Sequence, residues 1–163
     1  MAEQAATTVL LDYAQDKISV VDADGRFRYV NEAARQLLGF DPEQLLGTNA
    51  WEYVHPEDRD RVRTTFARVI DEENYSEVAG TYRHETADGS WVWLESRLSN
   101  LTDEALDGYV VSSRDVTDRI EAERQRTESE LRLQEIAGKT SEVLWVFDGT
   151  FSELLFCNSR CQE

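Results

Sequence analysis

Ile18-Ser-Val-Val-Asp-Ala-Asp-Gly-Arg-Phe-Arg-Tyr-Val-Asn31 consists of two short β-prone runs on either side of an Asp24-Gly25 pair. Because Asp-Gly readily adopts the positive φ angles of a tight turn, the stretch predicts two paired antiparallel strands. In the second strand, alternation predicts that Phe27 and Tyr29 lie on one face. The hairpin opens a pattern that continues as far as Asp115-Val116-Thr117, and this pattern decides the fold.

Three short helical segments are predicted after the hairpin, at residues 32–38, 41–47 and 50–54. Asn31 is a suitable cap for the first segment, and Gly39 ends it. The second begins with a cap, a first-turn proline and a capping-box partner, which are Asp41, Pro42 and Gln44.

A longer amphipathic helix is expected after His55-Pro56, because apolar residues recur there at helical spacing: Val62, Phe66, Val69 and Ile70. Three strands follow, at about residues 77–85, 90–100 and 108–116, with an Asp88-Gly89 turn between the first two. The short helices and the long helix lie between the second and third strands. The order predicts an α+β fold: a five-stranded antiparallel sheet with the short helices and the long helix on one face.

The chain is predicted to contain four parts: an N-terminal helix (1–16), the sheet domain (17–117), a connector helix (118–140) and a second hairpin (141–163). The connector is rich in Glu, Arg and Gln. It is either a solvated single helix or a dimeric coiled coil, with a thin seam at Ile120, Thr127 and Leu131. The last part repeats the strand–turn–strand pattern of the first hairpin, so we interpret it as the truncated start of a second copy of the sheet domain.

The charge argues against nucleic acid as a partner, because a net charge of −16 repels phosphates. Only Lys17 and Lys139 are lysines among 17 basic residues, a composition typical of proteins adapted to molar salt. An ordinary acidic protein is the alternative. No apolar run is long enough to span a membrane and no signal peptide is evident, so we expect a cytoplasmic protein. Cys157 and Cys161 lack the histidine partners of a zinc site.

Taken together, the motifs resemble a PAS domain with its C-terminal PAC segment. The resemblance covers residues 18–117 and depends on the opening hairpin, on Val54-His55-Pro56-Glu57-Asp58, on Asp88-Gly89-Ser-Trp-Val-Trp93 and on Arg114-Asp115-Val116-Thr117. The acidic composition and the tandem arrangement are also similar to haloarchaeal multi-PAS signal-transduction proteins, such as sensor histidine kinases and transducer-like proteins. The resemblance implies a sensory module of a longer polypeptide.

A PAS-like fold implies a small cavity between the sheet and its helices. The residues expected to line it are Tyr29, Leu46, Asn49, Trp51, Phe66, Val69, Ile70 and Tyr82. Asn49 and Tyr82 are the polar groups that could orient a small-molecule ligand. The alternative is that these side chains simply fill the core, which a domain of this size needs for stability.

No cofactor is identifiable. Haem-binding PAS domains usually carry a histidine on the long helix, and residues 57–72 contain none. Ala50 occupies the place of the reactive cysteine in flavin-binding relatives, which argues against a covalent flavin. His55 is expected to cap a helix, and His84 to lie on the surface. No catalytic or metal-binding set occurs, so the chain is not expected to be an enzyme, although the parent could be a histidine kinase.

The resemblance also implies a relay from the last strand to the outgoing helix. Asp115 would pair with an arginine or a backbone donor on the neighbouring strands, with Arg97 and Arg83 as the candidate arginines, and Thr117 would cap the helix. The predicted function is a sensory or regulatory module that passes on ligand or partner state through its C-terminal helix. The alternative is a ligand-free scaffold for dimerisation and helix alignment. The expected partners are a second copy of the chain and a downstream signalling domain of the same polypeptide.

Overall fold

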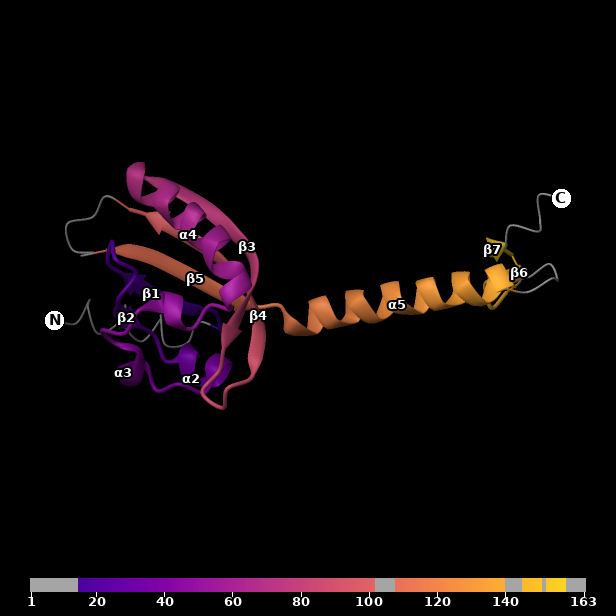
Figure 1. Ribbon diagram of the computed structural model, residues 1–163, viewed down its shortest axis with the longest axis horizontal. Helices are drawn as coiled ribbons and strands as arrows, with labels where there is room; N and C mark the ends of the chain where they lie inside the picture. The colour runs from indigo at the N-terminus through magenta and orange to yellow at the C-terminus, as the bar shows by residue number, and fades with distance from the viewer. Residues whose placement is uncertain (1–14, 102–107, 140–144, 151, 158–163) are drawn as a thin grey trace. The chain divides into compact units, whose positions relative to one another are not determined.

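The computed structural model describes residues 15–101, 108–139, 145–150 and 152–157 (Figure 1). The predicted N-terminal helix, residues 1–16, falls almost wholly outside these ranges, since residues 1–14 are not among them. The chain divides into two compact units, residues 1–118 and 119–163.

The first unit is built on a five-stranded antiparallel sheet with the order β2-β1-β5-β4-β3. The strands are β1 (Lys17–Val21), β2 (Phe27–Val30), β3 (Tyr75–Glu85), β4 (Trp91–Asn100) and β5 (Tyr109–Asp115). The last strand lies in the middle of the sheet, between the first strand and β4. This arrangement confirms the predicted fold class.

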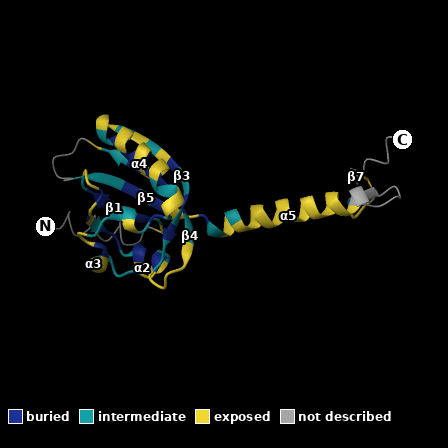
Figure 2. Ribbon diagram, viewed as in Figure 1, coloured by how far each residue is buried: buried dark blue, intermediate teal, exposed yellow. Residues whose placement is uncertain are grey.

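In the described part of this unit, the short helices and the long helix lie on the connection between β2 and β3, as predicted, and pack on the sheet (Figure 1). They are α2 (Ala33–Leu38), α3 (Pro42–Leu45), the 3₁₀ turn η1 (Ala50–Glu52) and α4 (Pro56–Asp71). Buried residues from both layers form one core, visible as dark blue ribbon in Figure 2. Leu38, Leu45, Val69 and Leu94 are each at most 1 % exposed and lie in this core.

The ends of the short helices follow the predicted signals with one exception. Gly39 has φ 75° and donates its N–H to the carbonyl of Arg35, which ends α2. The side chain of Gln44 accepts from the N–H of Asp41 at 3.0 Å and completes the capping box. Asn31, predicted as a cap, instead accepts from the N–H of Ile18 at 2.8 Å and so holds the start of β1.

The prediction that Phe27 and Tyr29 share a face is wrong, because β2 contains a bulge. Val20 pairs with Tyr29 and Val21 pairs with Phe27, so Arg28 has no opposite residue. The extra residue moves Phe27 and Tyr29 to opposite faces of the sheet. Phe27 is 2 % exposed and lies in the core, whereas Tyr29 shares the other face with Val20.

The second unit contains most of α5 (Thr117–Lys139), followed by β6 (Trp145–Phe147) and β7 (Leu154–Cys157). Nearly all of α5 is exposed (Figure 2), and Arg132 and Glu128 form an i,i+4 ion pair at 3.3 Å. The last two strands pair antiparallel, which matches the hairpin expected within residues 141–163. Its interpretation as the start of a second domain stays a prediction.

Candidate ligand cavity and sheet-to-helix junction

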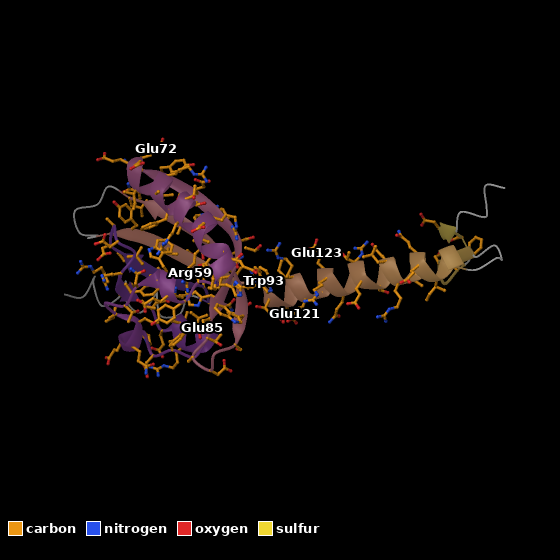
Figure 3. All side chains as sticks on the ribbon, in the orientation of Figure 1. Arg59, Glu72, Glu85, Trp93, Glu121 and Glu123 are labelled. Atoms are coloured by element: carbon orange, nitrogen blue, oxygen red, sulfur yellow. The ribbon has the colours of Figure 1, made fainter. Side chains whose placement is uncertain are left out.

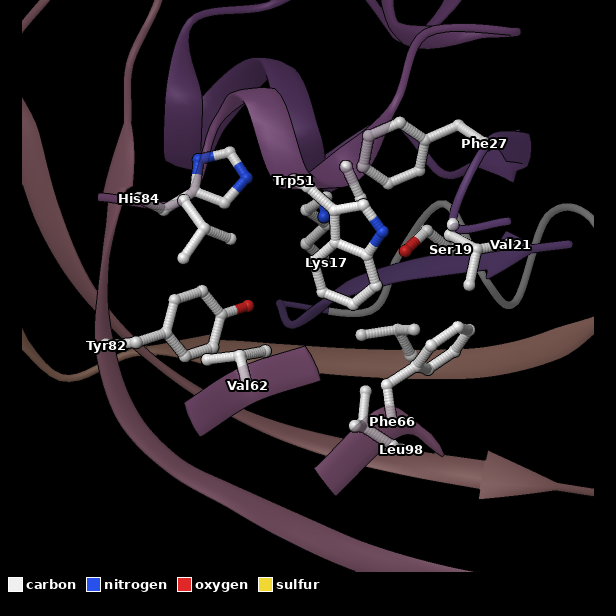
Figure 4. Close-up of a pocket in the computed structure, with 14 residues that line it drawn as sticks. Lys17, Ser19, Val21, Phe27, Trp51, Val62, Phe66, Tyr82, His84 and Leu98 are labelled. Atoms are coloured by element: carbon white, nitrogen blue, oxygen red, sulfur yellow. The ribbon is translucent and has the colours of Figure 1, made fainter. Parts of the chain in front are cut away.

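A cavity of about 40 Å³ lies between the inner face of the sheet, η1 and α4 (Figure 4). At ~10–15 Å³ for each water, this volume corresponds to roughly three water molecules. Its walls are mostly apolar and include Val21, Phe27, Trp51, Val62, Phe66, Leu98 and Val111. Its polar side chains are Lys17, Ser19, Tyr82 and His84.

Three of the residues predicted to line the cavity do so, namely Trp51, Phe66 and Tyr82. The Trp51 indole packs edge-on against Phe66, with ring centroids 5.3 Å apart, and the Arg63 guanidinium lies 5.3 Å from its ring centroid. Its indole nitrogen also lies against Gly25, where an added Cβ would come within 2.5 Å of that nitrogen. Trp51 is therefore fixed in place as one wall of the cavity.

The other predicted lining residues lie elsewhere. Val69 is in the core and Ile70 packs against it, but neither is a lining residue of the cavity. Leu46 is 46 % exposed, because Leu45 takes the inward position at the end of α3. Asn49 caps η1 by accepting from the N–H of Trp51 at 3.0 Å, and its amide donates to the Asp24 carbonyl at 3.1 Å. Tyr29 lies on the opposite face of the sheet because of the β2 bulge.

A chain of hydroxyl groups crosses the sheet beside the cavity. Ser96 on β4 donates to Ser113 on β5 at 2.8 Å. Since the one hydroxyl proton of Ser96 is used there, Tyr82 on β3 donates to Ser96, also at 2.8 Å. Burial raises the pKa of the Tyr82 phenol, so this group is neutral at physiological pH.

Lys17 continues this chain of polar side chains onto β1, where it pairs in register with Ser113. It is 2 % exposed, and its ammonium lies 4.9 Å from the centroid of the Phe27 ring. Burial lowers the pKa of Lys17 to about 8. Among the residues that the structure describes, no carboxylate lies within ion-pair distance of Lys17.

Sequence reasoning placed His84 on the surface, and the structure corrects this. His84 is 2 % exposed, stacks on Tyr53 with ring centroids 5.8 Å apart, and donates from Nδ1 to the Glu85 carbonyl at 2.7 Å. Burial, and secondarily the charge of Lys17, lowers the pKa of His84 to about 3, so the ring is neutral. The signal was strand alternation, which puts His84 on the same face as Tyr82 and its charged neighbours outside.

His55 acts as the predicted cap, since its Nδ1 accepts from the N–H of Glu57 at 3.3 Å. The next residues tie α4 to the sheet. Asp58 accepts from both the backbone N–H and Nε of Arg83, at 3.0 and 2.9 Å, and Glu57 accepts from the same guanidinium at 2.8 Å. Arg83 is thus committed to the start of α4 rather than to Asp115.

The junction between the sheet and α5 consists of Trp93, Asp115 and Thr117 (Figure 3 labels Trp93). Asp115 accepts from the N–H of Thr117 at 2.8 Å, so it is the carboxylate that caps the helix. Thr117 accepts through Oγ1 from the N–H of Trp93 at 2.9 Å, so it ties the helix start to β4. The two residues thus have roles other than those expected, because the donor to Asp115 lies at the start of the helix and not on a neighbouring strand.

Arg97, the other candidate partner of Asp115, pairs in register with Ser112, whereas Asp115 pairs with Leu94. Residues 94 and 97 lie three positions apart on β4, so they face opposite sides of the sheet. Arg97 is exposed and, with Asp16 and Arg114, borders a shallow polar hollow on the other face. The relay therefore does not include an Arg97–Asp115 pair.

A family model described as the PAS fold matches residues 11–121 of the chain. This is more than half of its 163 residues. The chain belongs to the PAS family.

Solved PAS structures share its architecture. The PAS domain of an HTR-like protein from Haloarcula marismortui is 27 % identical, has a TM-score of 0.61, and covers 70 % of this chain and 92 % of its own. The PAS-B domain of Drosophila melanogaster Cycle with bound ethylene glycol is 24 % identical and has a TM-score of 0.55. The match covers 61 % of this chain and 98 % of that domain. The second likeness shows the fold alone.

Among curated proteins, this PAS chain is 35 % identical to basic helix-loop-helix ARNT-like protein 2 from Gallus gallus. The match runs over 75 residues, which are 45 % of this chain. It is 32 % identical over 76 residues to hypoxia-inducible factor 1-alpha from Gallus gallus, 47 % of this chain. The match spans 12 % of the first relative and 9 % of the second. What these long proteins do as a whole is therefore not transferred to this PAS domain.

Within the described ranges, no group of three or more His, Cys, Asp or Glu side chains could hold a metal ion. None of the helices in those ranges combines the length and the apolar character needed to cross a bilayer.

Proposed function

We propose that this PAS domain is a sensory module that binds a small molecule in the cavity and passes its occupancy to α5 through the junction. The observation that carries the proposal is that the same two strands serve both sites. Leu98 on β4 and Val111 on β5 line the cavity, while Trp93 on β4 and Asp115 on β5 hold the start of α5. A ligand that shifts β4 against β5 therefore changes the geometry that caps the helix.

We also propose that the parent is a cytoplasmic prokaryotic signal-transduction protein of the haloarchaeal kind, either a sensor histidine kinase or a transducer-like protein. In this proposal, the three long strands of the domain are its PAC segment. The HTR-like PAS domain from Haloarcula marismortui supports this at 27 % identity. The acidic composition, with two lysines, supports adaptation to high salt. Any kinase activity would lie in a downstream domain, and we infer that this chain itself is not an enzyme.

A ligand-free scaffold that dimerises and aligns helices is the second candidate function. It is favoured by Leu131, Leu133 and Ile136 on α5, which are 60 %, 50 % and 57 % exposed. Leu133 and Ile136 lie three residues apart on one side of the helix, so this pair is suited to packing against the same helix of a second copy. This candidate predicts a homodimer whose α5 does not respond to any small molecule.

The two candidates differ in how α5 responds to cavity ligands. The test is hydrogen exchange of α5 in the wild-type chain and in Asp115→Ala, with and without a panel of small molecules: acetate, acetamide, acetamidinium and ethylene glycol. A sensor should show changed exchange at the start of α5 with at least one compound. In Asp115→Ala that compound should still bind, as seen by NMR shifts of Val21 and Val111, but leave α5 unchanged.

If no compound alters α5 in the wild type, the sensor proposal is wrong and the scaffold is favoured. If Asp115→Ala transmits the change as well as the wild type, the cavity can be sensory but the junction is not the route. Circular dichroism of the variant provides the folding control.

A further inference from the structure

The cavity contains a buried positive charge that has no negative partner among the described residues. The Lys17 side chain is 2 % exposed, and no ion pair joins it to a described carboxylate. The nearest titratable side chains of the cavity wall, Tyr82 and His84 on β3, are both neutral at physiological pH, so neither balances this charge. Nor do the residues of η1 and α4 that line the cavity, Trp51, Val62 and Phe66, carry charge. A buried ammonium in such surroundings is unfavourable unless an anion joins it.

The side chains near Lys17 include hydrogen-bond donors that have no acceptor among the described residues. The Ser19 hydroxyl is fully buried, lines the cavity and has no partner in the described part of the chain. The hydroxyl chain from Tyr82 through Ser96 ends at Ser113, which accepts there and keeps its own proton. Ser113 lies opposite Lys17 in the β1–β5 register. Lys17, Ser19 and Tyr82 are among the side chains that line the cavity in Figure 4.

The size and the remaining wall restrict the ligand further. A cavity of about 40 Å³ holds roughly three water molecules, so a ligand that fits has only a few heavy atoms. Opposite the polar end, Val62, Phe66 and Leu98 form an apolar wall. A ligand that satisfies both ends carries a negative charge at one end and a short apolar group at the other.

We propose that the cavity binds a short-chain monocarboxylate of about acetate size, whose carboxylate accepts from the Lys17 ammonium and the Ser19 hydroxyl. The inference rests on the proposed function, because it names the ligand class of the same cavity. It goes beyond that function in assigning the recognition to β1, a strand in which sequence reasoning found no site residue.

The experiment compares compounds of nearly the same shape and different charge. Acetate, acetamide and acetamidinium are titrated into ¹⁵N-labelled wild-type chain, and binding is followed at the amides of Val21 and Val111. We expect acetate to bind at least tenfold more tightly than acetamide, and acetamidinium not to bind. Equal binding of acetate and acetamide would overturn the proposal, and so would a chloride titration that reproduces the acetate shifts.

The chain contains only two lysines, which gives a matched control. Lys17→Met keeps the length of the side chain and removes its charge, whereas Lys139→Met changes a residue of α5. We expect Lys17→Met to weaken acetate binding at least tenfold, Ser19→Ala to weaken it several-fold, and Lys139→Met to leave it unchanged. Unchanged acetate binding by Lys17→Met would overturn the assignment of Lys17.

A direct readout follows the lysine itself. With ¹³C-labelled lysine, acetate should move the titration of the Lys17 Cε signal to higher pH, because an anion favours the charged form. If acetamide or ethylene glycol alters α5 and acetate does not, the carboxylate inference is wrong while the sensory function stands. If none of the compounds binds, the sensory function fails and the inference fails with it.

Discussion

Replacing Lys17 with methionine should make the unliganded protein more stable. The pKa of Lys17 falls from 10.5 to about 8 on folding because the ammonium is desolvated. At about 1.4 kcal/mol per pKa unit, holding this charge in the folded state costs about 3 kcal/mol at pH 7. Methionine has a similar length and no charge, so Lys17→Met should raise the free energy of unfolding by about 2–3 kcal/mol, allowing for the lost contact with Phe27.

The pH dependence gives the same effect a second signature. Because the folded-state pKa is lower than the unfolded one, the unfolded chain holds the extra proton between pH 8 and 10.5. The free energy of unfolding of the wild type therefore rises with pH across this window, by about 1.4 kcal/mol per unit from Lys17, and the full penalty is present below pH 8. Lys17→Met should lack this rise, and the difference between the two proteins isolates the lysine from other groups.

Urea denaturation at pH 7, 8, 9 and 9.5, followed by circular dichroism, measures both quantities, with Lys139→Met as the control. A Lys17→Met protein that is less stable than the wild type at pH 7 would refute the reasoning. So would parallel pH profiles for the two proteins. Either result would mean that the ammonium has a stabilising partner in the folded protein.

Three further experiments test the structure around the cavity. On folding, the pKa of His84 falls from 6.5 to about 3, so the free energy of unfolding should drop by about 2 kcal/mol as pH falls from 6.5 to 5. His84→Phe should lose this pH dependence in urea titrations. If the variant keeps the slope of the wild type, the ring of His84 is charged in the folded protein. Arg83→Gln should lower the free energy of unfolding by about 2 kcal/mol, because Asp58 loses its charged donor. A decrease below about 0.5 kcal/mol in urea denaturation would contradict the role of this bond in joining α4 to β3. Gly25→Ala and Gly89→Ala both place alanine at φ near +80°, but only the first meets the indole nitrogen, at 2.5 Å. The first should therefore be less stable by at least about 1 kcal/mol than the second, and equal urea midpoints would count against the close packing.

Local signals predicted the fold because most of them act within a few residues. The Asp24-Gly25 and Asp88-Gly89 turns, the capping box of Asp41 and the apolar face of α4 each depend on neighbours in sequence, and each was predicted. The α+β class followed from the short helices and the long helix, which lie on one connection between β2 and β3. The bulge at Arg28 could not be predicted, because it depends on how β2 registers against β1, and it reversed the side on which Tyr29 lies.

The polar part of the cavity was missed for a different reason. Lysine and histidine are usually exposed, so composition argued against burying Lys17 and His84. Strand alternation gave the opposite signal, since Lys17, Ser19 and Val21 share one parity on β1 and Tyr82 and His84 share one on β3. Only the assembled sheet shows that these parities face the same cavity. At the junction, sequence identified Asp115 and Thr117, but which of them caps α5 depends on the position of Trp93.

The buried lysine distinguishes a sensor from a scaffold more sharply than the shape of the cavity does. In a domain that only aligns helices, Lys17 lowers stability by about 3 kcal/mol with no compensating role. In a domain that binds a carboxylate, the same unpaired charge makes the folded state respond to occupancy, because the anion removes the penalty when it binds. One substitution then has opposite effects on two measurements: Lys17→Met should stabilise the empty domain and abolish its response to acetate. A scaffold predicts only the first effect, so measuring both on the same protein separates the two functions.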